Sequence, residues 1–118
     1  AGKKGDIHPD ELINIIRQSM WETVMIVRNE ETLKRNLNIL KEVNDRVKNL
    51  KIESAQEIRK YYELKNMLLV GEMITRACLT RKESRGSHYR EDYPESSDEW
   101  LKFIKIHKDH DDMAVSVL

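Results

Sequence analysis

The sequence is poor in the residues that cross-link or interrupt a chain: its 118 residues include one cysteine, two prolines and four glycines. Because the lone cysteine, Cys78, cannot form an intramolecular disulfide, the sequence excludes the small secreted domains that disulfides hold together. Glycine and proline mark most turns, so their scarcity indicates few turns and favours long helices. The length suits one domain, and we expect residues 1–118 to form a single one.

The sequence also lacks a net charge and long apolar runs. Its 21 basic residues balance 21 acidic ones, which disfavours nucleic acid as a partner. The longest apolar runs, such as residues 67–70, are too short for a membrane span or a signal peptide, so we expect no direct membrane contact. The chain begins at Ala1 rather than Met, and linker-like residues follow, so we expect a piece of a longer polypeptide or a processed product.

Apolar residues recur every three or four positions along most of the chain, a spacing typical of amphipathic helices. Three helices are predicted, at residues 9–28, 30–50 and 55–80. Each has a favourable start: Pro9 in the first turn, Asn29 as an N-cap, and Ser54 in a capping box with Glu57. The apolar stripe of the first helix is Ile13, Ile16, Met20, Val24 and Val27. That of the second is Leu33, Leu37, Leu40, Val43, Val47 and Leu50.

The third helix carries two neighbouring apolar stripes, which indicates that it is central and contacted from two sides. Gly71 interrupts it, and a close approach by a neighbouring helix would explain a glycine there. Because the links between the helices are short, consecutive helices must run antiparallel. The predicted fold class is therefore mainly α: an antiparallel, spectrin-repeat-like three-helix bundle over residues 9–80.

The character of the sequence changes after the third helix. Residues 81–99 form a long polar loop with almost no aliphatic residue, and residues 100–118 form a strand or hairpin tail. Alternating residues predict strands at 101–106 and 113–118. The expected order is thus bundle, polar loop and a short C-terminal β-hairpin.

The polar loop is the main candidate for chemistry, and it has two interpretations. Its arginines suit an anion or carboxylate site, with His88 as a proton carrier. Alternatively, its charges pair with one another and pin the bundle to a neighbouring domain. We favour the second interpretation, because an even mix of signs can neutralise itself.

Other candidate residues carry weaker signals. The cluster around His107 and His110 has ligand types for a divalent metal, but a solvated hairpin turn is the better interpretation. Cys78 is expected to be a small buried residue, and Trp21 and Trp100 to be packing or interface anchors. The sequence contains no glycine-rich dinucleotide or phosphate motif.

One stretch is more specific. Residues 79–94 read L-T-R-K-E-S-R-G-S-H-Y-R-E-D-Y-P. This stretch resembles the motif R-K-E-S-R-G-x-H-x-R-x-D-x-P in the C-terminal domain of the succinate dehydrogenase and fumarate reductase flavoprotein subunit. Residues 63–68 of the third helix, the pair Met20 and Trp21, and residues 98–101 also resemble that family.

The resemblance implies a non-catalytic helical domain appended to a larger FAD-dependent oxidoreductase of electron transport and the citric acid cycle. In that family, succinate and fumarate interconvert by hydride transfer to or from flavin N5 in the upstream domains. No catalytic, cofactor-binding or metal-binding role is therefore assigned to this chain.

The implied partners are the FAD-binding domain of the same polypeptide and an iron–sulfur subunit. The implied location is the cytoplasm, with the parent complex at the inner face of the cell membrane. The residues expected to form the interdomain motif loop are Arg81, Glu83, Ser84, Arg85, Gly86, His88, Arg90 and Asp92.

Each motif residue type suggests a physical role. Arg85 and Arg90 are expected to hold carboxylates or carbonyls of the partner domain by forked hydrogen bonds, oriented by Glu83 and Asp92.

Two small residues of the motif are expected to shape its backbone. Gly86 permits a positive φ, or a close approach by another backbone, and Ser84 can cap a backbone amide.

Three alternatives remain open. L-aspartate oxidase resembles the sequence through E-S-R-G-x-H and D-Y-P, although that branch tends to lack an arginine at the position of Arg90. Adenylylsulfate reductase is a more remote relative. A free-standing helical interaction module, binding a partner helix through its apolar stripes, is the third.

Overall fold

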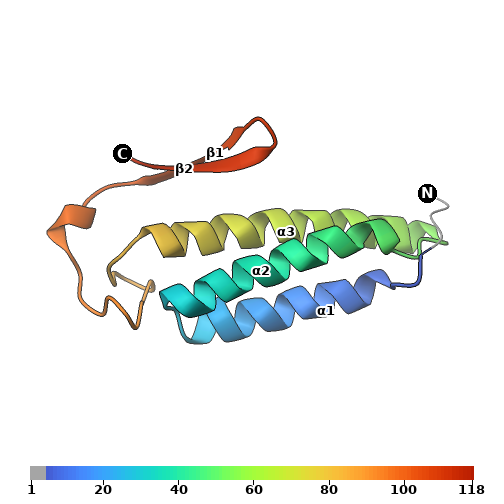
Figure 1. The fold of residues 1–118 in the computed structure, drawn as a ribbon, viewed down its shortest axis with the longest axis horizontal. Helices are drawn as coiled ribbons and strands as arrows, with labels where there is room; N and C mark the ends of the chain where they lie inside the picture. The colour runs from blue at the N-terminus through green and yellow to red at the C-terminus, as the bar shows by residue number, and fades with distance from the viewer. Residues whose placement is uncertain (1–4) are drawn as a thin grey trace.

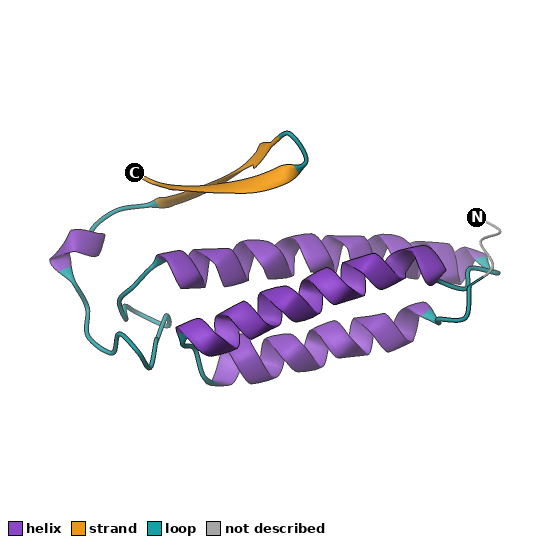
Figure 2. Cartoon of the chain, in the orientation of Figure 1, coloured by secondary structure: helices purple, strands orange, loops and turns teal. Residues whose placement is uncertain are grey.

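The computed structural model describes residues 5–118 and consists of three antiparallel helices with a β-hairpin beside them (Figure 1). The α-helices are α1 (Pro9–Met20), α2 (Glu30–Arg46) and α3 (Ala55–Thr80). The shorter helical segments are the π-helix η1 (Trp21–Ile26) and the 3₁₀ turns η2 (Val47–Asn49) and η3 (Asp98–Trp100). The strands are β1 (Ile104–Asp109) and β2 (Asp112–Val117). The predicted fold class, a mainly helical bundle followed by a loop and a hairpin, is confirmed (Figure 2).

The first helix changes its geometry part-way along. The prediction of one helix over residues 9–28 is wrong in its second half, because α1 ends at Met20 and continues as the π-helix η1. The Thr23 hydroxyl donates a hydrogen bond to the Ser19 carbonyl, but Thr75 makes the same kind of bond to Gly71 O within the regular helix α3, so this bond does not explain the change. Periodicity alone does not distinguish these two kinds of helix, since both keep a similar apolar face.

The second and third helices begin at the predicted caps. The Asn29 side chain accepts from Thr32 N at 2.9 Å, and Asn29 N donates to Thr32 Oγ1 at 3.1 Å. Ser54 Oγ accepts from Glu57 N at 3.2 Å, which starts α3 at the predicted residue. The third helix has the predicted bounds, whereas the second stops four residues early and gives way to η2.

Two apolar clusters form the core of the bundle. The larger one is made of Leu12, Ile13, Ile16, Leu40, Val43, Val47, Leu50, Ile52, Leu64 and Leu68. The smaller one, made of Val24, Leu33 and Cys78, lies toward the polar loop. The prediction that Cys78 is a small buried residue is confirmed, and burial raises the pKa of its thiol.

A buried polar layer of Ser19, Asn36 and Thr75 links the three helices. Ser19 Oγ donates to Asn36 Oδ1, and Asn36 Nδ2 donates to Thr75 Oγ1 at 2.9 Å. The predicted stripe placed Leu37 on the buried face, but Leu37 is half-buried and Asn36 is fully buried. The reason is the phase of α2, whose buried residues step from Leu33 to Asn36 and then to position 40.

Gly71 of α3 is not explained by the predicted close approach. A Cβ built on it would lie 3.5 Å from Leu40 Cδ1 and 3.5 Å from Met20 Sδ, which is ordinary van der Waals contact. The neighbouring helices are near, but they leave room for a methyl group. The prediction that a close approach by a neighbouring helix explains Gly71 is therefore wrong.

The hairpin lies alongside α3 (Figure 1). Its two strands are antiparallel, with Ile106 opposite Val115, and a tight turn in which His110 has φ 55° joins them. Both strands differ from the prediction: β1 begins at 104 instead of 101, and β2 covers 112–117 instead of 113–118. A lone two-stranded hairpin is marginal in water, so packing on α3 contributes to its stability. Over residues 5–118, none of the helices combines the length and apolar character needed to cross a membrane.

Candidate functional site

The polar loop folds against the end of the bundle at which η1 and α3 end and α2 begins (Figure 1). It contains every residue predicted for the motif loop. Two short turns shape it, one from Arg85 to His88 and one from Arg90 to Tyr93. Glu91 N donates to Arg28 O at 2.7 Å, so the loop backbone is joined directly to the segment between η1 and α2.

The first turn depends on a glycine. Arg85 N donates to His88 O at 2.8 Å, and His88 N donates to Arg85 O at 3.0 Å. Gly86 has φ 61°, in the left-handed region that side chains disfavour, as the first central position of a type II′ turn requires. The predicted positive φ of Gly86 is thus confirmed. A Cβ there would meet nothing within 4 Å, so the backbone angle and not lack of space calls for glycine.

Glu83 is a fully buried carboxylate surrounded by donors. Its Oε2 accepts from Arg85 Nε at 3.0 Å and from Arg81 Nη1 at 2.7 Å, and its Oε1 accepts from Arg85 Nη2 at 3.1 Å and from Ser97 N at 2.8 Å. The hydrogen bonds from Arg85 do most to lower the pKa of Glu83 to about 2, with Ser97 and Arg81 adding to them against the effect of burial. The prediction that Glu83 orients an arginine within the loop is confirmed.

The guanidinium of Arg85 makes its forked bond inside the loop. Its Nη2 also donates to Ser97 O at 3.0 Å, which adds a second internal acceptor beside Glu83. Arg81 donates to Trp100 O at 2.8 Å and Lys102 O at 2.7 Å, and its guanidinium lies 5.2 Å from the Trp100 ring centroid. These two arginines tie the loop to the segment that leads into the hairpin.

Arg90 is the most buried arginine of the loop, with 1% of its side chain exposed. It forms a bidentate pair with Asp92, from Nε to Oδ1 at 3.0 Å and from Nη2 to Oδ2 at 2.7 Å. Its Nη1 donates to Leu79 O at 2.8 Å and Cys78 O at 3.3 Å, at the C-terminus of α3. The prediction that Arg90 holds a partner domain is therefore wrong, because its side chain points into its own domain. The prediction that Asp92 orients it is confirmed.

Asp92 extends this ion pair to a second helix. Its Oδ2 accepts from Glu30 N at 3.0 Å, at the N-terminus of α2. Burial alone would raise the pKa of Asp92, but the hydrogen bonds from Arg90 and from Glu30 N lower it overall. The pair thus places a cation at the C-terminus of α3 and an anion at the N-terminus of α2, which complements both helix dipoles.

The side chains of Ser84 and His88 are also fixed by hydrogen bonds within the domain. Ser84 Oγ accepts from Arg90 N at 2.9 Å and donates to Tyr93 O at 2.7 Å, so the predicted capping role is confirmed. His88 Nδ1 lies 2.9 Å from Arg28 Nη1, and its Nε2 lies 3.1 Å from Arg81 O. A guanidinium can only donate and a carbonyl can only accept, so the ring is the neutral tautomer with its proton on Nε2.

Both ring nitrogens of His88 are already hydrogen-bonded within the domain, which argues against a role as proton carrier. Burial is the largest influence on the pKa of His88 and lowers it. The hydrogen bond to Arg81 O raises this pKa by less than burial lowers it, and the charges of Arg28, Arg90 and Arg81 add to the lowering. Arg28 was missed in the sequence, since no local pattern links it to a histidine 60 positions away.

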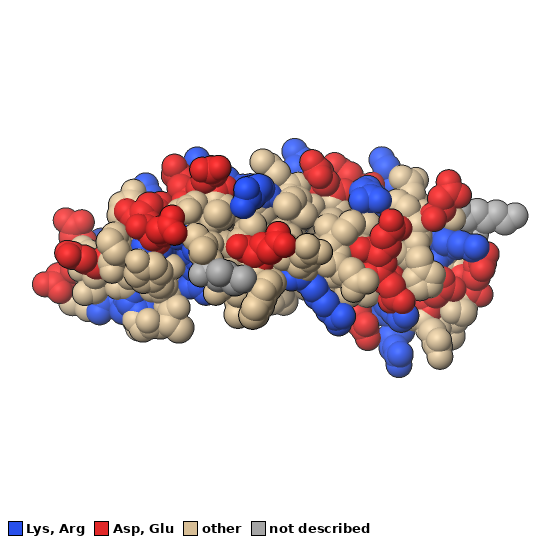
Figure 3. Space-filling view, turned by 90° about the horizontal axis from the view of Figure 1, so that it is seen from below, with Lys and Arg blue, Asp and Glu red and all other residues tan. Residues whose placement is uncertain are grey.

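The loop therefore supplies its own counter-ions. Arg81 and Arg85 pair with Glu83, and Arg90 pairs with Asp92. Basic and acidic groups are interspersed over the face shown in Figure 3. Cations that hold the diphosphate of a cofactor such as FAD have to be free to do so, and these three arginines are already committed to Glu83 and Asp92. His107 and His110 lie on the hairpin, and within residues 5–118 no three ligand-type side chains gather where they could hold a metal ion.

The sequence profile described as "Fumarate reductase flavoprotein C-term" matches residues 14–117. The chain belongs to this family. The predicted resemblance to the succinate dehydrogenase and fumarate reductase flavoproteins is confirmed. The family's flavoproteins are oxidoreductases, and relatives include L-aspartate oxidases and adenylylsulfate reductases as well.

Curated relatives match most of the chain. An uncharacterised FAD-dependent oxidoreductase of Methanocaldococcus jannaschii is 44% identical over 103 residues, which are 87% of this chain and 19% of that protein. One subunit of the fumarate reductase (CoM/CoB) of Methanothermobacter marburgensis is 34% identical over 110 residues, which are 90% of this chain and 20% of that protein. An L-aspartate oxidase of Acinetobacter baylyi is 39% identical over 95 residues, 75% of this chain and 16% of that enzyme.

Solved structures share the fold over nearly the whole chain. The quinol fumarate reductase FrdA of E. coli gives a TM-score of 0.86 at 26% identity, covering 99% of this chain and 22% of that one. The adenylylsulfate reductase of Archaeoglobus fulgidus also gives 0.86 at 26% identity, covering 98% of this chain and 19% of that one. The chain thus spans about a fifth of the length of the proteins that it matches.

Proposed function

We propose that this chain is the non-catalytic C-terminal domain of a flavoprotein subunit that interconverts succinate and fumarate. The observation that carries the proposal is the motif loop, whose ion pairs Arg85–Glu83 and Arg90–Asp92 are internal to the domain, with Glu83 and Arg90 as their buried members. A group that is held in such a pair is poorly placed to bind a substrate carboxylate, because it would first have to break the pair. The loop therefore acts as a rigid structural piece.

The chemistry is proposed to take place in the upstream domains. When bound there, the flavin would supply the hydride-transfer chemistry of the reaction at its N5. No step of this reaction is assigned to a residue of this chain. The similarity to the fumarate reductase of Methanothermobacter marburgensis supports the choice of substrate.

The loop is proposed to dock on the FAD-binding domain of the same polypeptide. Its outer face presents the exposed turn at Gly86 and Ser87 together with the rings of Tyr89 and Tyr93. The ion pairs beneath hold this face in one shape, so little conformational entropy is lost on docking. We further propose that the whole protein has a cytoplasmic location at the inner face of the cell membrane, where it binds an iron–sulfur subunit.

A second candidate function is that of L-aspartate oxidase, favoured by the 39% identity to the Acinetobacter baylyi enzyme. Arg90 weighs against it, because that branch tends to lack an arginine at this position. An adenylylsulfate reductase is a third candidate, on structural similarity.

The test is a substrate panel on the native polypeptide that carries this sequence, purified with an antibody against the domain. The proposal predicts bound flavin, dye reduction with succinate and oxidation of a reduced dye with fumarate. Activity with L-aspartate alone, or with AMP and sulfite alone, would replace the proposal by the corresponding relative. A polypeptide without flavin would leave a free-standing interaction module as the better description.

A further inference from the structure

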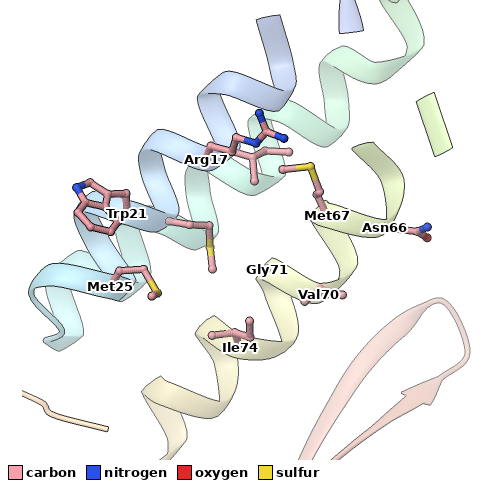
Figure 4. A pocket seen from close by; sticks show the side chains of 10 residues that line it. Arg17, Trp21, Met25, Asn66, Met67, Val70, Gly71 and Ile74 are labelled. Atoms are coloured by element: carbon pink, nitrogen blue, oxygen red, sulfur yellow. The ribbon is translucent and has the colours of Figure 1, made fainter. Parts of the chain in front are cut away.

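An apolar groove of about 460 Å³ lies between α1 and α3 on the side of the bundle away from α2 (Figure 4). Trp21 and Met25 form one rim, and Val70 and Ile74 form the other. Arg17 and Asn66 lie at its end. The groove therefore has an apolar centre and a polar border, which is the usual anatomy of a surface that binds another protein segment.

The side chains at the rim are unusually exposed for their type. The exposed fraction is 60% for Trp21, 62% for Met25 and 47% for Val70, and Ile74 is exposed as well. Four large apolar residues around one groove make a contiguous patch, whereas single exposed apolar residues are ordinary. The hairpin covers a different face of α3, so within residues 5–118 this patch has no covering element.

The backbone at the groove is irregular as well. Trp21 and Met25 both belong to the π-helix η1, and they lie four positions apart on it. A π-helical segment is rare and costs helical hydrogen-bond geometry, and such segments are frequent at functional sites. This irregularity is independent of the apolar lining, and the rim side chains Trp21 and Met25 both belong to it.

We propose that this groove receives an apolar segment of the remaining, flavin-bearing part of the same polypeptide. The inference rests on the proposed function and adds to it a second, apolar contact beside the polar motif loop. The occupant follows from the comparison of lengths: the chain spans about a fifth of its relatives, so about four-fifths of each relative lies outside this domain. Exposing this apolar patch to water is unfavourable in free energy, and contact with that larger part would remove the patch from water.

Cysteine labelling of the full-length flavoprotein tests the proposal without depending on a destabilising change. Val70→Cys places a thiol at the groove, and Tyr62→Cys is the matched control on the same helix, where the native side chain is 63% exposed and lies outside the groove. With a maleimide probe, Val70→Cys is expected to react at least tenfold more slowly than Tyr62→Cys in the native protein. Equal rates at the two positions, fast or slow, would overturn the inference.

A photo-reactive phenylalanine analogue in place of Trp21 identifies the occupant. The expected product on irradiation is an intramolecular cross-link to the flavin-bearing part of the same polypeptide, located by mass spectrometry. A cross-link to a second copy, or to a separate subunit, would overturn the inference. If the purified protein carries flavin and interconverts succinate and fumarate while Val70→Cys reacts freely, the docking inference alone fails. If it carries no flavin, the proposed function fails.

Discussion

Replacing Arg90 by alanine tests how much the buried ion pair stabilises the domain. The change removes the bidentate bond to Asp92 and the donors to the last carbonyls of α3, and it leaves Asp92 without its counter-ion. Breaking a buried pair typically costs about 3–5 kcal/mol, and the 29% exposure of the Asp92 side chain places the cost near the lower end, at about 3 kcal/mol. For a chain of this size, that loss corresponds to a fall in Tm of roughly 10–15 °C.

The assay is urea and thermal unfolding followed by circular dichroism, with Arg59→Ala as the control. Arg59 is exposed and pairs with Glu63 at 3.9 Å on the surface of α3, so its loss is expected to cost less than about 0.5 kcal/mol. Arg90→Lys is expected to lie between the two, since a lysine keeps the charge but not the fork. If Arg90→Ala costs no more than Arg59→Ala, the reasoning that this pair fastens the loop to the helix ends is refuted.

Four further predictions concern stability. Asn36→Ala is expected to cost about 1–3 kcal/mol in urea unfolding, because the buried hydroxyl of Ser19 loses its acceptor; no loss would contradict the polar layer. Gly86→Ala is expected to cost about 1 kcal/mol because of its positive φ, and an unchanged midpoint would contradict this. Gly71→Ala is expected to stabilise α3 by up to about 1 kcal/mol, and a destabilisation would show that the methyl does not fit. The depressed pKa of Glu83, about 2, gives stability that is present above its unfolded value and is lost as the pH falls through the folded one. Unfolding of Glu83→Gln should thus vary less between about pH 4.5 and pH 2 than that of the unmodified chain, and equal slopes would contradict the buried carboxylate.

Much of the fold could be predicted because its signals are local. The bounds of α3 follow from a cap at Ser54 and from an apolar period that stops where the polar stretch begins after Thr80, and both depend on residues close in sequence. The change to a π-helix at Trp21 could not be predicted, because the apolar spacing of residues 9–28 fits either kind of helix. A signal for the polar layer was present, since Asn36 continues the buried spacing of Leu33, but it was outweighed by the apolar Leu37.

In the motif loop, too, the features set by neighbouring residues could be predicted, and those set by distant residues could not. Its backbone roles at Gly86 and Ser84 could be predicted, because a left-handed turn and a capped amide are properties of a few neighbouring residues. The direction of Arg90 could not be predicted, since it depends on the end of α3 lying beneath the loop. The same limit applies to His88, whose partner Arg28 lies 60 positions earlier in the sequence, in the link between η1 and α2.

Membership of a larger, flavin-bearing polypeptide is the property on which the proposed function depends. It can be measured as the size of the native polypeptide, by immunoblot of an extract with an antibody against this domain, together with flavin fluorescence of the same band. We expect a fluorescent band at about five times the mass of this chain, since the chain spans about a fifth of its relatives. A band at the mass of the chain itself, without flavin, would contradict the proposed function.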